Sequence, residues 1–309
     1  VDPEAVIQNL TAASIYQVPM LMEEQGMDSI VLKKLDMPDK PKDMTYWHEM
    51  VERILKHYDR KVTIAVVGKY VELQDAYISI TEALKHAAVA NESELKIKWV
   101  NAENIEAPET DMQKIMEGVD GILVPGGFGD RGIEGKIKAV QYARENKVPF
   151  FGICLGMQCI AIEFARNVLG YADANSREMD EKTPHNVIDI MEEQKSITNM
   201  GGTMRLGAYE CVLQKGSKAY EAYGTEHIQE RHRHRYEFNN SFKEAYEAAG
   251  MKCVGINPES DLVEIVEIPA LKWFVGTQFH PEYSSTVLHP HPLFVAFVKA
   301  AIENENENK

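Results

Sequence analysis

The sequence contains few cysteines, and they form no paired motif. Only four of its 309 residues are Cys, and none belongs to a C-x-x-C pair. A chain of this length can bury a large apolar core, so it does not need disulfide bonds in order to fold. The sparse cysteines therefore indicate a reducing, cytoplasmic setting.

Positive charge and long apolar runs are scarce as well. The chain has 33 Lys and Arg against 48 Asp and Glu, a formal net charge of -15. Nucleic acids and anionic membranes attract clustered Lys and Arg, so we expect neither as a partner. No run approaches the ~18 apolar residues of a membrane span, and we find no signal peptide. The chain starts at Val1 rather than Met, and we expect it to be a fragment.

Proline and charge without periodicity mark a linker near the start of the chain. The segment DMPDKPKDMT (36–45) has these properties, and the residues before it contain too few apolar positions for a complete domain. We therefore predict a short N-terminal remnant with its linker over 1–45 and one large domain over 46–303. The last residues, 304–309, are polar and of low complexity, and we predict that they are disordered.

Most of the large domain alternates between apolar, β-branched segments and segments with helical periodicity. Such alternation predicts a mainly parallel central sheet covered by helices on both faces, a three-layer α/β sandwich. Beyond about residue 196 the pattern changes to shorter strands and hairpins, which predicts smaller antiparallel strands before a last helix at 292–303. The expected strands are 61–67, 95–100, 121–125 and 148–154, and the expected helices are 45–58, 77–90, 109–117, 133–145 and 156–169.

The loop GGFGDRG (126–132) carries glycines spaced as G-x-G-x-x-G after a strand and before a helix. A dinucleotide fingerprint would need an acidic residue at the end of the next strand, where Cys154 stands instead. A phosphate loop fails as well, because Asp130 and Ile137 occupy positions that need Gly and Ser or Thr. The remaining interpretation is a loop whose bare backbone N–H groups can point at an oxygen atom.

One cysteine stands in a distinctive setting, GICLG (152–156), at the end of an apolar strand. A buried cysteine at a strand–helix junction is the plainer interpretation. The alternative is a nucleophile elbow, in which Cys154 sits in a strained turn and side chains at Gly152 or Gly156 would collide with the backbone. The helix N-terminus would then favour a thiolate, and the N–H group of Leu155 would be an oxyanion donor.

The segment TQFHPEY places His280 and Glu282 two residues apart. In an extended chain such residues share a face, so Glu282 can orient the imidazole while His280 acts as the base for a thiol. A surface histidine and glutamate at a strand end are the plainer interpretation of the pair alone. Together with an elbow cysteine on a parallel sheet, the pair favours a hydrolytic Cys–His–Glu triad.

RHRHRYE (231–237) is the strongest local cluster of charge. Nucleic-acid contact is one interpretation, and a metal site at His232 and His234 is another. Neither is favoured, because alternation places the three arginines on one face and no set of Cys or carboxylate residues completes a metal shell. An arginine that binds a substrate carboxylate fits the cluster better, and we predict no metal.

Six segments occur in an order that resembles the CTP synthase family. They are PGGFGDRG, GICLGMQ, ANSREM, GGTMRLG, ERHRHRYEFNN and QFHPEY. The region is similar to the C-terminal class I glutamine amidotransferase domain of that family, and GKYVELQDAYISITEALKHA (68–87) resembles the start of this domain. SIYQVPMLMEEQGM (14–27) resembles the end of the family's synthetase domain, so the resemblance covers nearly the whole chain.

The resemblance implies roles for a set of residues. The catalytic triad would be Cys154, His280 and Glu282. The glutamine site would consist of oxyanion N–H groups at Gly127 and Leu155, of Gln158 and Glu178 at the α-amino group, and of Arg235 at the α-carboxylate. GTP activates the family, and Arg205 in GGTMRLG is assigned to this effector.

The resemblance further implies hydrolysis of L-glutamine to glutamate and ammonia through a cysteine thioester. In the intact family enzyme, a cytoplasmic homo-tetramer, this ammonia serves the ATP-dependent amination of UTP to CTP. The synthetase domain that binds ATP, Mg²⁺ and UTP is absent here except for its last ~35 residues. We therefore expect no cofactor in this chain and no CTP formation by it. Two alternatives stay open: a γ-glutamyl peptide hydrolase on the same fold, and a non-catalytic domain kept for regulation or assembly.

Overall fold

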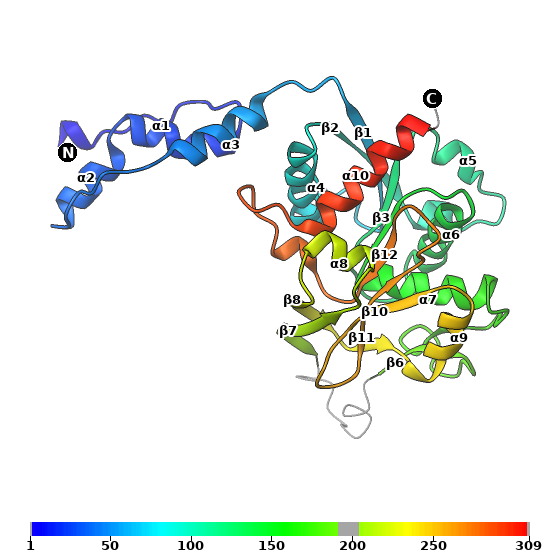
Figure 1. Ribbon diagram of the computed structural model, residues 1–309. Coiled ribbons are helices and arrows are strands. Elements are labelled where there is room, and N and C mark those ends of the chain that lie inside the picture. The colour runs from blue at the N-terminus through cyan, green and yellow to red at the C-terminus, as the bar shows by residue number, and fades with distance from the viewer. Residues whose placement is uncertain (1, 191–203, 308–309) are drawn as a thin grey trace. The chain divides into compact units, whose positions relative to one another are not determined.

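The computed structural model describes residues 2–190 and 204–307. The chain divides into two compact units, residues 1–59 and 60–309, and each unit is described by itself (Figure 1). A search of the described helices finds none with the length and apolar character that a membrane crossing requires.

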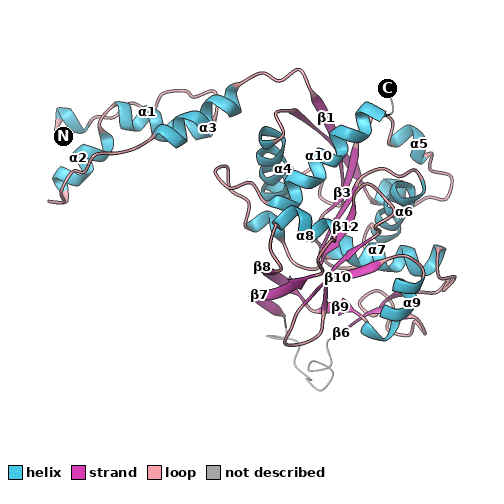
Figure 2. Cartoon of the chain, in the orientation of Figure 1, coloured by secondary structure: helices cyan, strands magenta, loops and turns pink. Residues whose placement is uncertain are grey.

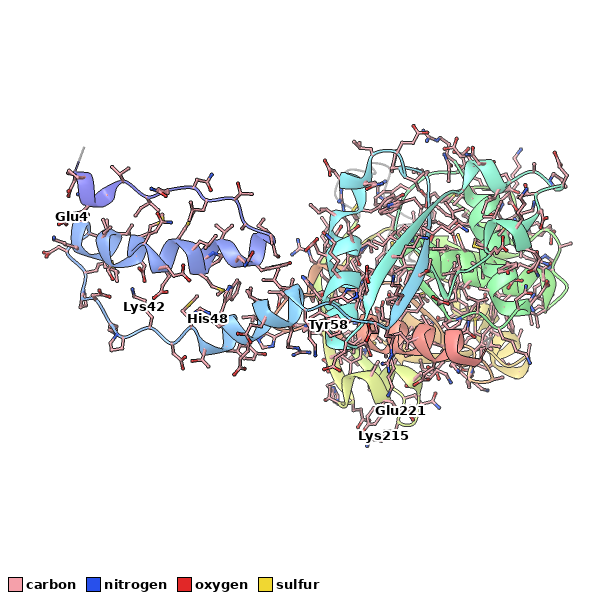
Figure 3. The ribbon with its side chains drawn as sticks, turned by 90° about the horizontal axis from the view of Figure 1, so that it is seen from above. Glu4, Lys42, His48, Tyr58, Lys215 and Glu221 are labelled. Atoms are coloured by element: carbon pink, nitrogen blue, oxygen red, sulfur yellow. The ribbon has the colours of Figure 1, made fainter. Side chains whose placement is uncertain are left out.

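The first unit is small and has little buried surface. None of its described residues ahead of Met50 is fully buried, and Glu4, Lys42 and His48 lie along its length (Figure 3). A unit with so little buried surface gains little stability from apolar burial. Its helices are α1 (Val18–Glu24), α2 (Met27–Lys34) and α3 (Thr45–Leu55).

The segment predicted to be a linker does not separate the two units. The indole N–H of Trp47, in α3, donates to the backbone carbonyl of Tyr16 over 2.9 Å. This contact ties α3 to the first unit, and the chain divides after Asp59 instead of at the predicted boundary between residues 45 and 46. Local composition marks a break in periodicity at 36–45, but it does not show which side of the break a helix packs against.

One nine-stranded sheet runs through the second unit, in the order β2-β1-β3-β4-β12-β11-β10-β7-β8. The first five strands of this order pair in parallel, which confirms the mainly parallel centre. The other four are antiparallel and extend the same sheet, and a second sheet has the order β5-β6-β9. The bounds are β1 (Lys61–Gly68), β2 (Glu94–Asn101), β3 (Gly121–Val124), β4 (Phe150–Ile153), β5 (Asn175–Ser176), β6 (Asn186–Ile190), β7 (Arg205–Leu213), β8 (His227–His234), β9 (Tyr236–Phe238), β10 (Lys252–Ile256), β11 (Val263–Glu267) and β12 (Phe274–Thr277).

Helices cover both faces of the large sheet, as predicted for a three-layer sandwich (Figure 2). Alternate residues of β1 enter different cores: Val62, Ile64 and Val66 pack with α4 and α10, whereas Ala65 and Val67 pack with α6 and α7. A strand buried on both sides is apolar on both faces, which explains the continuous apolar run IAVV (64–67) where β1 is fully buried. The helices are α4 (Ile78–Ala90), α5 (Met112–Ile115), α6 (Ile133–Glu145), α7 (Leu155–Asn167), α8 (Lys218–Tyr223), α9 (Lys243–Ala248) and α10 (Pro292–Glu307).

The last helix, α10, is longer than predicted. It continues to Glu307, so most of the tail that was expected to be disordered is helical, and residues 308–309 lie outside the described residues. Glutamate is a good helix former, and the segment contains neither Gly nor Pro to end the helix. Polar composition alone therefore gave the wrong boundary.

The parallel strands place their following segments at one edge of the sheet. β3 leads into the glycine-rich loop, β4 leads into Cys154, and β12 leads into the segment that contains His280. Because β3, β4 and β12 are neighbours in the sheet, these three segments meet at its carboxyl edge.

Candidate active site

Cys154 occupies the strained turn that the sequence predicted. It lies between the end of β4 and the first residue of α7, with φ 51° and ψ -102°. Its backbone N–H donates to the carbonyl of Thr277 over 2.6 Å, and its carbonyl accepts from the N–H of Gln158 over 3.1 Å. Neighbouring elements therefore hold a conformation that a non-glycine residue rarely adopts.

The two flanking glycines are required by close backbone approach. A Cβ on Gly152 would lie 2.7 Å from the carbonyl carbon and oxygen of Gly156, and a Cβ on Gly156 would lie 2.2 Å from the carbonyl oxygen of Val124. The predicted collision at both positions is confirmed. The sharp turn that places the thiol at the helix N-terminus exists only because these positions lack side chains.

Replacing Gly156 with Ala should lower the free energy of unfolding by about 3 kcal/mol, because the nearest obstacle is a backbone oxygen that cannot move alone. Denaturant unfolding at equilibrium measures this loss. Gly118→Ala is the matched control, since its new Cβ meets nothing within 4 Å and only the φ of 71° opposes it. The control should cost about 1 kcal/mol. Equal losses in the two variants would contradict the close approach at the elbow.

His280 and Glu282 form a buried pair beside the cysteine. Nδ1 of His280 lies 2.8 Å from Oε1 of Glu282, which leaves Nε2 for the thiol. A Cβ on Gly126 would lie 2.7 Å from Cε1 of His280 and 3.6 Å from Cβ of Cys154, so the imidazole and the thiol flank the same glycine. Burial lowers the pKa of His280, but its interactions with Cys154 and Glu282 outweigh burial and raise this pKa to about 11. The environment therefore favours the imidazolium form of His280.

Four of the five predicted glutamine-binding residues line one pocket, and Leu155 is not among its lining residues. Its lining includes Gly127, Cys154, Gln158, Glu178 and Arg235. The carboxylate of Glu178 accepts from the N–H of Gly129 over 3.1 Å, so it faces the glycine-rich loop. The pocket offers a carboxylate, a guanidinium and a nucleophile together, which suits a molecule that carries both an ammonium and a carboxylate group.

Two backbone segments can present N–H groups next to the thiol. Leu155 is the first residue of α7, where a backbone N–H has no acceptor within its own helix. A Cβ on Gly127 would lie 3.4 Å from Cδ2 of Leu155, so the glycine-rich loop runs close to the start of this helix. This proximity fits the predicted oxyanion site at Gly127 and Leu155.

The three arginines of RHRHRYE do not act as one set. Arg231 and Arg233 lie on the exposed face of β8, whereas β8 ends before Arg235, and Arg235 lines the pocket. The guanidinium of Arg233 lies over the ring of Phe128, 5.8 Å from its centroid. Of the three, Arg235 is therefore the one placed to meet a carboxylate in the pocket.

The histidines of the same segment belong to a buried polar cluster, which we define as Arg205, His232, His234, Glu237 and Glu264. Nη1 of Arg205 lies 2.5 Å from Oε1 of Glu264, and Nδ1 of His232 lies 2.8 Å from Nε2 of His234. Nδ1 of His234 lies 3.4 Å from Oε1 of Glu237. Burial lowers the pKa of His232 to about 2 and that of His234 to about 3, so both imidazoles are neutral. The cluster adjoins the pocket, because His234 also lines it.

The position of Arg205 does not fit its expected contact with an effector. Its side chain is only 6% exposed, and its guanidinium pairs inward with Glu264. Arg205 begins β7 opposite His234 of β8, and this register directs both side chains to the same buried face. The expectation rested on the position of GGTMRLG in the sequence; residues 201–203 of that segment lie outside the described residues.

The argument against a metal at His232 and His234 also needs correction. Carboxylates are present after all, since ligand atoms of His232, His234 and Glu264 lie within 4.8 Å of one another. Glu264 comes from β11, so no local motif predicted it. The guanidinium of Arg205 already supplies a positive charge to Glu264, and an ion-paired cluster describes the group better than a metal site.

Known proteins resemble this chain in sequence and in fold. The family model for glutamine amidotransferase class-I matches residues 72–300. A CTP synthase of Bacteroides thetaiotaomicron is 66% identical over 99% of this chain and 57% of its own length, and one of Clostridium beijerinckii is 55% identical over 100% and 57%. The chain thus spans a little over half the length of these curated relatives. A solved glutaminase domain of Trypanosoma brucei CTPS with bound acivicin is 41% identical, with a TM-score of 0.74, over 78% of this chain and 94% of that one.

Proposed function

Because this chain belongs to the class-I glutamine amidotransferase family, we propose that it hydrolyses L-glutamine to glutamate and ammonia at Cys154. One observation carries the proposal. Cys154 stands on a strained turn at a helix N-terminus, beside the His280–Glu282 pair, in a pocket that offers groups of both charges. These features suit acyl transfer from an amino-acid side chain to a thiolate.

The proposed reaction proceeds in two steps. The Cys154 thiolate attacks the side-chain amide carbon of glutamine, and the N–H groups of Gly127 and Leu155 stabilise the resulting oxyanion. The protonated His280 then donates its proton to the leaving nitrogen, so ammonia departs and a glutamyl thioester remains. In the second step His280 takes a proton from water, which attacks the thioester and releases glutamate. Glu282 keeps the proton on Nδ1 and stabilises the imidazolium.

Substrate recognition is proposed to rest on the charges of the pocket. Arg235 would bind the α-carboxylate of glutamine, and Gln158 and Glu178 would bind its α-ammonium group. An amino acid held at both groups places its side-chain amide at a fixed distance from them. Such positioning is worth several orders of magnitude in rate when the amide meets the nucleophile correctly.

We further propose that the chain is the ammonia-producing part of a CTP synthase. Relatives of that name support this, as does the fact that the chain covers a little over half of their length. In the longer protein the synthetase domain would bind ATP, Mg²⁺ and UTP and receive the ammonia, and GTP would act as an activator. We also propose that the intact enzyme is a homo-tetramer in the cytoplasm.

The isolated chain should hydrolyse glutamine slowly while its thiol remains reactive. A polypeptide of residues 1–309 alone does not contain the synthetase domain that would hold the pocket in its productive geometry, and ~1 Å of misplacement can cost about a hundredfold in rate. Activation of the thiol is local, because it depends on the helix N-terminus and on His280. A diazo-ketone analogue of glutamine should therefore label Cys154. Glutamate release, measured with and without GTP, together with peptide mass mapping of the label, checks both expectations.

Each outcome of that experiment separates the candidate functions. Labelling of Cys159, Cys211 or Cys253 in place of Cys154 would put the site elsewhere. An unlabelled, folded chain would favour the non-catalytic alternative. Faster release from a γ-glutamyl dipeptide than from glutamine would favour the peptide hydrolase. Fast glutamine turnover without GTP would mean that the domain needs no partner.

A further inference from the structure

Gln278 makes a contact with the nucleophile that the triad does not account for. It lies one residue beyond β12 and is fully buried. Its side-chain Nε2 donates to Sγ of Cys154 over 3.7 Å, within the range of hydrogen bonds to sulfur. A primary amide next to a thiolate is a neutral donor, so it can stabilise the negative charge without supplying a competing proton.

A second side chain determines which end of the Gln278 amide faces the sulfur. Nε2 of Gln158 donates to Oε1 of Gln278 over 3.4 Å and also to the carbonyl of Tyr236 over 3.1 Å. A carbonyl only accepts, so the contact with Tyr236 requires the amino end of Gln158 at this position. Gln278 must then present its oxygen to Gln158 and its amino end to Cys154.

The backbone also holds Gln278 in place. Its N–H donates to the carbonyl of Glu264 over 2.8 Å, and the preceding residue, Thr277, accepts from the N–H of Cys154. Gln278 is therefore fixed to β11 on one side and, through Thr277, to the elbow on the other. A donor held in this way needs no reorganisation when negative charge forms on the sulfur.

The charged and titratable neighbours of the thiol do not replace this donor. His280 faces it as the triad base, and Glu282 acts on it through His280. Lys136 of α6 is almost fully buried nearby, and burial lowers the pKa of its ammonium group. Cys159 of α7 stays protonated, because burial raises its pKa to about 12. Among the described side chains around the thiol, Gln278 supplies a neutral hydrogen-bond donor to Sγ.

We propose that Gln278 is a further catalytic-site residue, whose amide holds the Cys154 sulfur as a thiolate and links it to Gln158. The proposal deepens the proposed function and rests on it, because Gln158 is also the residue expected at the α-amino group of glutamine. A glutamine molecule bound to Gln158 would thereby hold the Gln278 amide, which donates to Cys154, more rigidly in place. The two ends of the substrate site are connected through one chain of hydrogen bonds.

The test is the pH dependence of Cys154 alkylation by iodoacetamide, a small electrophile that does not resemble glutamine. Gln278→Met keeps the length of the side chain but removes the donor, and it should move the midpoint of the alkylation profile up by about one pH unit. Below the midpoint the rate should fall about tenfold. Gln278→Glu should move it further, because a carboxylate repels the thiolate. Gln229→Met, the same change at an exposed position of β8, is the matched control and should leave the profile unchanged.

The outcomes are decisive in each case. The proposal would be overturned if both Gln278 variants fold and their alkylation profiles coincide with that of the wild type. If both variants melt early, Gln158→Met carries the test, since it keeps Gln278 but removes the donor that orients its amide. It should move the midpoint in the same direction by about half a unit, and an unchanged midpoint would overturn the proposal. A shifted profile in a chain that releases no ammonia from glutamine would instead refute the proposed function alone.

Discussion

Replacing Cys154 with Ala should reduce glutamine hydrolysis roughly 10⁴-fold or more. No thioester can form without the sulfur, and among the residues that the structure describes the other three cysteines are buried at positions without a base comparable to His280. Ammonia release, assayed beside a melting curve, measures the effect. The melting temperature should change little, because the substitution removes one atom and keeps the Cβ.

Cys159→Ala is the matched control for this variant. It removes the same atom from α7, where the thiol is fully buried and its pKa is raised to about 12. Hydrolysis should stay within about twofold of the wild type. Activity near wild type in Cys154→Ala would refute the nucleophile, and loss of activity in both variants would point to damage of α7 rather than to lost chemistry.

Replacing Glu264 with Gln should lower the free energy of unfolding by about 3 kcal/mol, the largest stability loss that we expect from a single polar substitution. The guanidinium of Arg205 would lose a partner 2.5 Å away while remaining buried, and an uncompensated buried charge is costly. Glu237 lies 3.8 Å from Arg205 and can take over part of the pairing, which keeps the loss near the lower end of the range. Denaturant unfolding at mildly alkaline pH, above the pKa of about 7 that burial gives Glu264, measures it.

Glu237→Gln is the matched substitution within the same cluster, and we expect it to be nearly neutral. Burial raises the pKa of Glu237 well above its usual range, whereas Arg205 opposes burial more strongly at Glu264, where the pKa is about 7. Of the two carboxyl groups, Glu237 is therefore the one that we expect to be protonated, and Glu264 the one that carries the charge paired with Arg205. A protonated carboxyl and a carboxamide have similar shape and hydrogen-bonding capacity, so below about pH 4.5, where the carboxyl is largely protonated in the unfolded chain as well, the free energy of unfolding should change by less than about 1 kcal/mol.

The same pair predicts a pH dependence of stability. A carboxyl whose pKa is raised in the folded state binds more protons there than in the unfolded chain, so stability falls as pH rises above its unfolded pKa of about 4.5. Glu237→Gln removes this titration, and its advantage over the wild type should therefore grow from pH 4.5 upward. A variant that loses as much stability as Glu264→Gln, or whose deficit deepens with rising pH, would place the charge on Glu237 instead.

Several features of the molecule follow from short-range rules and were predictable from the sequence. Positions 152 and 156 require glycine because a Cβ at either one would meet backbone atoms. The obstacle for Gly152 is Gly156, four residues along the chain, and the obstacle for Gly156 is Val124 on the adjacent strand β3. His280 and Glu282 are two residues apart, so their contact also depends on local geometry. The alternation of apolar strands and periodic helices likewise predicted the parallel half of the sheet. Each strand that is buried on both faces is itself an apolar run, and such a run can be recognised without knowing its neighbours.

Other features depend on which strands become neighbours, and the sequence does not encode this locally. The order β12-β11-β10-β7-β8 brings Glu264 of β11 to Arg205 of β7, although the two residues are 59 positions apart. This pairing buries Arg205 in the polar cluster. It also places the carboxylate of Glu264 beside His232 and His234, where the sequence predicted none. Gln278 and Glu178 likewise carried no local pattern, because their partners come from distant elements.

The sequence by itself thus determined those parts of the site in which a residue and the residues that fix its geometry are close together in the chain. The elbow, the His–Glu pair and the sheet type belong to this part. The tertiary structure alone decided which polar groups are buried together, which charge each of them carries and which donor faces the sulfur. The physical reason is that burial and strand pairing act between residues far apart in the chain, and they set the ionisation and orientation of a side chain more strongly than its neighbours in sequence do.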